Sequence, residues 1–158
     1  IEKHLPEIIA HDVQVVWQTG KYYYKGIIER LGMEYHPNVR ILEFLNKMDL
    51  AYAAADVIIS RAGAGTIAEL CLVKKPVILV PSPNVAEDHQ TKNAMALVKN
   101  GAALLINDRS AEDTLVKEAL ELLGNKEQCE KLSENLGKMA LPEADEIIAG
   151  EVLKLIKA

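Results

Sequence analysis

Cysteine, long hydrophobic runs and clustered basic residues are scarce in this sequence, and each shortage excludes a class of protein. The two cysteines, Cys71 and Cys129, lie far apart and form no C-x-x-C pattern, which predicts small buried side chains in a reducing compartment. No apolar run approaches the roughly 18 residues that a membrane-spanning helix needs, and no secretory signal peptide is recognisable. We therefore expect a soluble, cytoplasmic protein, and a peripheral role at a membrane stays open.

The charge balance argues against a nucleic-acid partner. The chain has 18 Lys and Arg against 23 Asp and Glu, a net charge of −5, whereas proteins that bind nucleic acid usually carry a basic patch. Of its 158 residues, 49% are apolar and 26% are charged, which is enough for one globular domain with its own core. The chain opens at Ile1 inside a helical pattern, so we expect a fragment of a longer protein.

Strand and helix patterns alternate along the chain. Short apolar or β-branched runs predict strands over residues 12–17, 38–44, 56–60, 77–81 and 102–107. The stretches between and after them predict helices over 21–31, 47–55, 66–73, 88–100, 110–123 and 126–139, with a terminal helix over 142–158. Strands joined through helices are parallel, and nearly all-apolar strands are covered on both faces. The predicted fold is a doubly wound, Rossmann-like parallel α/β sheet, which binds ligands at the carboxyl ends of its strands.

A glycine motif follows the third predicted strand. Gly63-Ala-Gly-Thr-Ile-Ala68 fits G-x-G-x-x-[GA], the pattern of dinucleotide-binding loops. That fingerprint belongs after the first strand of its domain and requires an acidic residue at the tip of the next strand. Here two strands precede the motif, and the next strand ends in Pro81-Ser-Pro83. We therefore predict a phosphate or diphosphate site at the end of a helix starting near Thr66, with a plain strand-to-helix turn as the alternative.

Polar residues near the same edge of the sheet suggest a sugar nucleotide. Glu69 can accept hydrogen bonds from vicinal ribose hydroxyls, although it also fits a capping box with Thr66. His89 and Gln90, within the polar segment 84–93, can bind sugar hydroxyls, unless that segment is only a solvated loop and helix cap. Thr19 closes the first strand at this edge, where an ordinary turn is the simpler interpretation.

Five collinear stretches make the sequence similar to the carboxy-terminal half of the MurG family of bacterial N-acetylglucosaminyltransferases. They are WQTG (17–20), EFLNKM (43–48), ADVIISRAGAGTIAE (55–69), PVILVP (76–81) and HQTKNA (89–94). The resemblance implies a two-domain, B-type glycosyltransferase in which residues 1–158 are the carboxy-terminal, UDP-sugar donor-binding domain. The amino-terminal acceptor domain and the first strand of the donor domain would then precede Ile1.

The resemblance also implies which residues bind the donor. The backbone of Leu45 would face uracil, the first turn of the helix after the glycine motif would face the diphosphate, and Glu69 would bind the ribose. The chain departs from many relatives at Gly65, where they carry a bulkier residue, and at His89, where they carry glutamine. The full set of implied donor-binding residues is Thr19, Leu45, Met48, Ala64, Gly65, Thr66, Glu69, His89 and Gln90.

The implied activity is an inverting transfer of N-acetylglucosamine from UDP-N-acetylglucosamine to a lipid-linked muramoyl-pentapeptide. This reaction belongs to peptidoglycan biosynthesis and so to cell-wall biogenesis, cell shape and division. The whole protein would be a hexosyltransferase, peripheral on the cytoplasmic face of the bacterial plasma membrane, that binds its acceptor through the absent domain. The family's catalytic base and acceptor site would lie in the absent parts, so we expect this fragment alone to be inactive, and we expect no metal or other cofactor.

Three other functions stay open from the sequence. They are a UDP-N-acetylglucosamine 2-epimerase of similar architecture, a half-transferase that pairs with a separate membrane-anchored subunit, and a non-catalytic module that binds nucleotide sugars.

Overall fold

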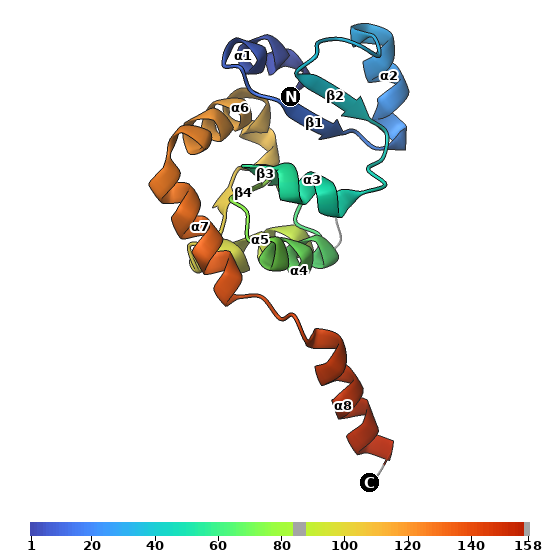
Figure 1. Cartoon of the computed structure of the whole chain (residues 1–158), viewed down its shortest axis with the longest axis vertical. Coiled ribbons are helices and arrows are strands. Elements are labelled where there is room, and N and C mark those ends of the chain that lie inside the picture. The colour runs from blue at the N-terminus through green and yellow to red at the C-terminus, as the bar shows by residue number, and fades with distance from the viewer. Residues whose placement is uncertain (84–87, 157–158) are drawn as a thin grey trace.

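The computed structural model describes residues 1–83 and 88–156, which form alternating strands and helices (Figure 1). Each helix corresponds to a helix expected from the sequence, and α2 has the predicted bounds. A short 3₁₀ turn, Glu2–His4, leads into the first helix. The helices are α1 (Leu5–Ala10), α2 (Lys21–Leu31), α3 (Met48–Ala54), α4 (Ala64–Val73), α5 (His89–Lys99), α6 (Asp108–Gly124), α7 (Lys126–Lys138) and α8 (Ala144–Ile156).

All strand pairs are parallel, as the alternating pattern predicts, but the described strands form two sheets. One sheet pairs β1 with β2, and the other has the order β3-β4-β5. No strand among the described residues joins β1 to β3, so the continuous sheet expected from the sequence is divided at this point. The strands are β1 (Val15–Gln18), β2 (Val39–Leu42), β3 (Ile58–Ser60), β4 (Val77–Leu79) and β5 (Leu104–Leu105).

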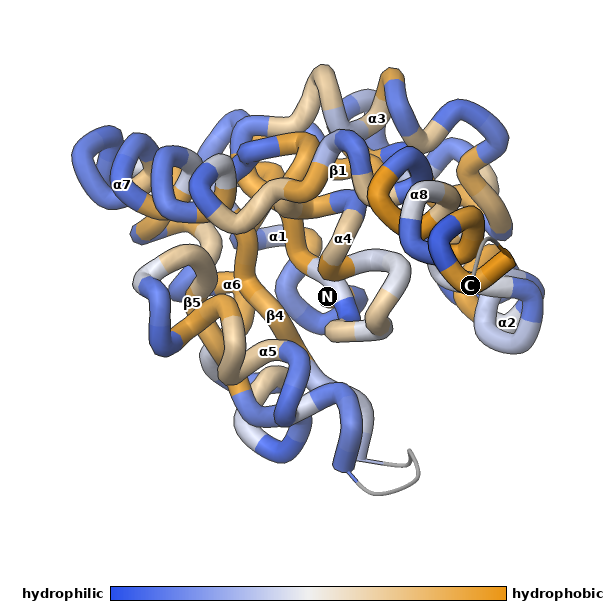
Figure 2. The backbone as a smooth tube through the Cα atoms, turned by 90° about the horizontal axis from the view of Figure 1, so that it is seen from below, coloured by the Kyte–Doolittle hydropathy of each residue, from blue (hydrophilic) through white to orange (hydrophobic). Residues whose placement is uncertain are grey.

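The central strand β4 shows why the fold has helices on both faces. Successive strand residues point to opposite faces, and in β4 Val77 and Leu79 join one hydrophobic cluster while Ile78 joins another. All three side chains are fully buried, and β4 is hydrophobic along its length in Figure 2. Burial of both faces explains the uninterrupted apolar run that predicted this strand.

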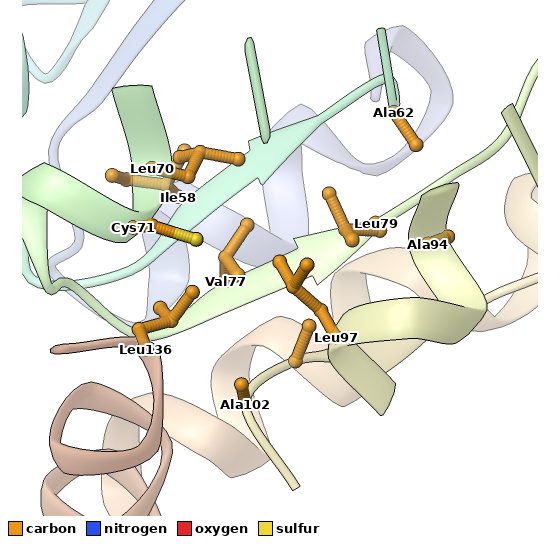
Figure 3. Packing of buried hydrophobic residues seen from close by; sticks show 11 residues of the cluster. Ile58, Ala62, Leu70, Cys71, Val77, Leu79, Ala94, Leu97, Ala102 and Leu136 are labelled. Carbon is orange, nitrogen blue, oxygen red and sulfur yellow. The ribbon is translucent and has the colours of Figure 1, made fainter. Parts of the chain in front are cut away.

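Helices α4, α5 and α7 contribute side chains to the cluster around Val77 and Leu79 (Figure 3). Each helix contributes a leucine that is at most 1% exposed: Leu70 of α4, Leu97 of α5 and Leu136 of α7. This packing fixes α4 and α5 against the strands from which they emerge, and it therefore fixes the amino-terminal end of each helix at the same edge of the sheet.

The terminal helix α8 differs from the others because none of its residues is buried. It extends away from the rest of the chain in Figure 1, with Ile148, Leu155 and Ile156 all at least 65% exposed. The helix itself was predicted, but these apolar side chains are not covered by any part of residues 1–83 and 88–156.

Candidate functional site

The first group of predicted residues lies where β1 and β2 end. Thr19 donates its backbone N–H to the Leu42 carbonyl at 2.9 Å, and its hydroxyl donates to the Leu42 and Gly20 carbonyls, both at 3.3 Å. The hydroxyl is thus turned toward the backbone. Met48, the first residue of α3, is partly buried at the end of the loop that follows β2. Thr19 and Met48 therefore help to shape this edge of the sheet.

The backbone of Leu45 is already engaged. Its N–H donates a hydrogen bond of 2.8 Å to Oε1 of Gln18, the last residue of β1. This bond ties the loop after β2 to the neighbouring strand. The Leu45 N–H is available to another acceptor only after the Gln18 amide has moved aside.

The amino-terminal end of α4 lies directly after β3, as the glycine motif predicted, but the helix begins earlier than expected. Ala64, Gly65 and Thr66 form its first turn, and the first backbone bond runs from the Ile67 N–H to the Gly63 carbonyl at 2.9 Å. No side chain of residues 1–83 or 88–156 caps this end. The three preceding N–H groups therefore point out of the helix, where its dipole favours an anion.

Two details of the motif differ from the sequence prediction. Thr66 is the third helical residue and not the N-cap, which excludes the capping box with Glu69. Gly63 has φ −64°, and Gly65 is not among the residues with positive φ, so neither glycine is required by the turn. A Cβ atom added at Gly65 would meet no atom within 4 Å. The missing side chain at Gly65 therefore leaves the surface of the first turn open, which suits close approach by a ligand.

Two amide side chains of α5 hold the residue that precedes this turn. Gln90 Oε1 accepts hydrogen bonds from the N–H groups of Ala62 at 3.3 Å and Ser82 at 2.9 Å. Asn93 Nδ2 donates to the Ala62 carbonyl at 3.0 Å. Ala62 is fully buried, so these bonds satisfy backbone groups that water cannot reach. The oxygen of Gln90 thus fixes the loop, and its Nε2 group has no partner among the described residues.

Arg61 fastens the ends of β3 and β4 to the start of α6. Its Nη1 atom donates to the carbonyls of Val80 at 3.1 Å and Pro81 at 3.3 Å, and it pairs with the Asp108 carboxylate at 2.5 Å. Because Arg61 binds carbonyl groups that follow β4, the guanidinium holds the loop that leads toward α5. We assign Arg61 a structural role beside the site.

Glu69 lies on the exposed side of α4, about one turn beyond the amino-terminal end of the helix. Its Oε2 atom accepts a hydrogen bond of 3.1 Å from the hydroxyl of Tyr52 on α3. Burial, and then the bond to Glu69, raise the pKa of Tyr52 to about 12. Tyr52 is therefore a neutral donor at physiological pH, and both oxygens of Glu69 retain lone pairs for further donors.

His89 is the first residue of α5 and is exposed. It lies one position before Gln90, at the helix end that faces the glycine motif. Residues 84–87 of the predicted sugar-binding segment lie outside the described residues. Within the described part of that segment, His89 begins α5, and Gln90 and Asn93 both contact Ala62 before the glycine motif.

Sequence reasoning did not include four residues that organise this edge in its predicted set. Asn93 lies inside the predicted helix over residues 88–100, and Gln18 follows the predicted strand over residues 12–17 by one position. Tyr52 carries no sequence signal, because its partner is 17 residues away on another helix. The four residues are Gln18, Tyr52, Arg61 and Asn93.

Two depressions lie away from the predicted residues, one along β5 and the start of α6 and the other beside Ile1. In residues 1–83 and 88–156, no three His, Cys, Asp or Glu side chains are grouped as metal ligands would be. No helix in the same ranges has the length and hydropathy needed to cross a bilayer.

Comparison with known families assigns this architecture. A sequence profile described as "Glycosyltransferase family 28 C-terminal domain" matches residues 1–148. The chain belongs to this family. Membership of family 28 thus accounts for the parallel strands and for the helices that cover them.

Two curated relatives of this family 28 domain share the name UDP-N-acetylglucosamine--N-acetylmuramyl-(pentapeptide) pyrophosphoryl-undecaprenol N-acetylglucosamine transferase. The protein from Bacteroides thetaiotaomicron is 52% identical over 94% of this chain and 40% of its own length. The protein from Bacteroides fragilis is 54% identical over 91% of this chain and 38% of its own length. The chain therefore spans about two fifths of the length of these relatives.

Solved structures agree with the family assignment. The crystal structure of Acinetobacter baumannii MurG matches 97% of this chain and 45% of its own, with a TM-score of 0.75 and 26% identity. A structure titled as the glycotransferase of kitacinnamycin matches 86% of this chain with a TM-score of 0.65 at 24% identity. The second match shows the shared fold only.

Proposed function

We propose that this chain is the donor-binding half of an inverting transferase that moves N-acetylglucosamine from UDP-N-acetylglucosamine to a lipid-linked muramoyl-pentapeptide. The observation that carries the proposal is the identity of 52% over 94% of the chain with a relative of that name. The edge formed by β1 to β4, with an uncapped helix end beside a carboxylate, supports it. Because the proposed acceptor is a membrane lipid, we also propose that the whole protein works at the cytoplasmic face of the bacterial plasma membrane.

The proposed donor lies along the carboxyl ends of the strands. Uracil meets the Leu45 backbone, with Thr19 and Met48 nearby, and the ribose hydroxyls bind Glu69. The diphosphate sits on the free N–H groups of Ala64, Gly65 and Thr66, and the sugar reaches His89 and Gln90. Along the chain, α3 joins β2 to β3, and α4 joins β3 to β4.

The amino-terminal end of α4 would contribute to the reaction by stabilising the leaving diphosphate. In the transfer, an acceptor hydroxyl attacks the anomeric carbon, the bond from that carbon to the diphosphate oxygen breaks, and UDP leaves. Negative charge on the diphosphate grows as this bond breaks. The N–H groups at the start of α4 are fixed before the reaction, because Ala62 is held by Gln90 and Asn93. Groups that are already oriented stabilise the developing charge without reorganisation.

The divided sheet supports the proposed domain organisation. β1 and β3 each present an edge that no described strand pairs, and relatives are more than twice as long as this chain. We propose that a strand preceding Ile1 lies between β1 and β3 and completes the sheet of residues 1–158. The acceptor-binding domain and the catalytic base belong to the same preceding part.

Expression of the complete gene product tests the proposal. Incubated with UDP-N-acetylglucosamine and a lipid-linked muramoyl-pentapeptide, it should release UDP and form the disaccharide-linked lipid in equal amounts. Glu69→Ala should weaken donor binding, whereas Glu121→Ala, an exposed carboxylate on α6, should not. An epimerised donor, transfer that needs a second subunit, or binding without transfer would contradict the proposal and support one of the three other functions.

A further inference from the structure

Tyr52 is the partner that the structure gives to the Glu69 carboxylate. The two side chains come from different helices and meet at 3.1 Å. Tyr52 lies one turn after Met48 in α3, and Glu69 lies on α4 just beyond the uncapped helix end. The hydroxyl therefore reaches the one acidic side chain that the proposed function assigns to the ribose.

The ring of Tyr52 is held by packing. It is partly buried and lies against the hydrophobic cluster that contains Leu70 and Val77. Tyrosine has only two side-chain torsions, so a packed ring fixes the position of its hydroxyl. Glu69, by contrast, is exposed and has three torsions, and it loses considerable rotational freedom when a ligand orders it.

We infer that Tyr52 is a positioning residue for nucleotide binding, which holds the Glu69 carboxylate in the orientation that accepts the two ribose hydroxyls. This inference rests on the proposed function. A bond from a neutral hydroxyl to a carboxylate is charge-assisted and short-range, so it selects one orientation of the carboxylate. Tyr52 occupies one lone pair on Oε2, and the remaining lone pairs suffice for a vicinal diol.

The inference predicts a loss of affinity that depends on the ribose. Tyr52→Phe keeps the packed ring and removes only the hydroxyl. In the complete gene product, we expect this change to weaken UDP binding about threefold to tenfold, because the ligand must then order Glu69 itself. Binding of 2′-deoxy-UDP, which lacks one of the two hydroxyls, should change by less than about twofold.

Calorimetric titration of UDP and 2′-deoxy-UDP into four proteins provides the test. They are the wild type, Tyr52→Phe, Glu69→Ala and the double variant. The matched control is Tyr24→Phe, which removes a hydroxyl from a partly buried tyrosine of α2 with no hydrogen bond among the described residues. Thermal unfolding of each variant confirms that it is folded. If Tyr52 acts through Glu69, Tyr52→Phe has no further effect in the Glu69→Ala background.

Each outcome has a defined meaning. An equal loss for UDP and 2′-deoxy-UDP, or additive losses in the double variant, would overturn the role of Tyr52 and leave the proposed ribose site intact. Unchanged UDP binding by Glu69→Ala would remove the carboxylate from the site and overturn both assignments. A ribose-dependent loss that disappears in the double variant establishes the positioning role.

Discussion

Substitution of Gln90 can test whether its side-chain oxygen, and not its Nε2 group, stabilises the fold. Its oxygen accepts two backbone N–H groups, from Ala62 and Ser82. Gln90→Ala removes the acceptor from both. The Ala62 N–H is in a fully buried residue, so it loses its partner without gaining water, whereas Ser82 is only partly buried and can be hydrated.

The expected loss of stability follows from these two environments. A buried donor left without a partner costs about 1–3 kcal/mol, and the Ala62 bond is long, which favours the lower end of that range. With a smaller contribution from Ser82, Gln90→Ala should destabilise the domain by about 2 kcal/mol. For a domain of this size, that corresponds to a fall in Tm of roughly 4–8 °C.

Gln90→Glu separates the two halves of the side chain. A carboxylate keeps an acceptor for both N–H groups, so we expect stability within about 1 kcal/mol of the wild type. It lacks the Nε2 donors, so recognition of the sugar should be lost while UDP alone still binds. Lys92→Ala, at an exposed position of the same helix, controls for the effect of alanine on α5.

Urea denaturation followed by far-UV circular dichroism measures the stability of all four proteins, and calorimetry with UDP-N-acetylglucosamine and UDP measures binding. An unchanged midpoint for Gln90→Ala would show that the Ala62 N–H finds another acceptor, and the reasoning would be wrong. Equal destabilisation by alanine and glutamate would show that the oxygen is not what holds the loop.

Three further predictions concern the core, the ionisation of a tyrosine and the loop after β2. Leu136→Ala, in a fully buried side chain, should lower the free energy of unfolding by about 2–5 kcal/mol, measured by urea denaturation; a loss below about 1 kcal/mol would mean that the core collapses around the cavity. Because the pKa of Tyr52 is raised to about 12, its contribution to stability is complete below its unfolded value of about 10 and is lost as the pH rises through 12. An absorbance titration should therefore show a late phenolate step that Tyr52→Phe abolishes, and its persistence in that variant would assign it elsewhere. Gln18→Ala frees the Leu45 N–H, so UDP should bind about twofold to fivefold more tightly by calorimetry; weaker binding would show that Gln18 is needed to shape the loop.

The elements that could be predicted from the sequence are those whose pattern is local. Helix α2 has the predicted bounds, because its spacing of apolar residues and the glycine at each end are visible in the chain. Strand β4 was predicted from an apolar run, and burial on both faces explains that run. The start of α4 was placed two residues late, because Gly63 and Ala64 provide no capping side chain to mark it.

The contacts that organise the candidate site are not local, and this is why the sequence did not reveal them. Tyr52 meets Glu69 only because α3 and α4 pack on the same cluster. Gln90 was predicted to bind sugar, but its oxygen holds Ala62, 28 residues away. The division into two sheets likewise depends on which strands become neighbours in space. Residue types at an edge of the sheet could be predicted, but their partners could not.

Three side chains hold backbone groups near the candidate site, and this arrangement predicts which substitutions will affect binding. Gln18 holds the backbone of Leu45, Gln90 holds that of Ala62, and Arg61 holds the carbonyls that follow β4. In each case a side chain from one element fixes a loop of its neighbour, and only at Leu45 does the proposed donor meet the held backbone itself. A residue that meets the ligand through its backbone tolerates substitution of its side chain. At Gln90 and Arg61 the side chain itself holds a loop in place, so its loss should disturb that loop. Gln18 differs, because it occupies the N–H group that the proposed donor would use. Substitutions at Gln90 and Arg61 should therefore impair donor binding more than those at Leu45, although Leu45 lies closer to the proposed uracil.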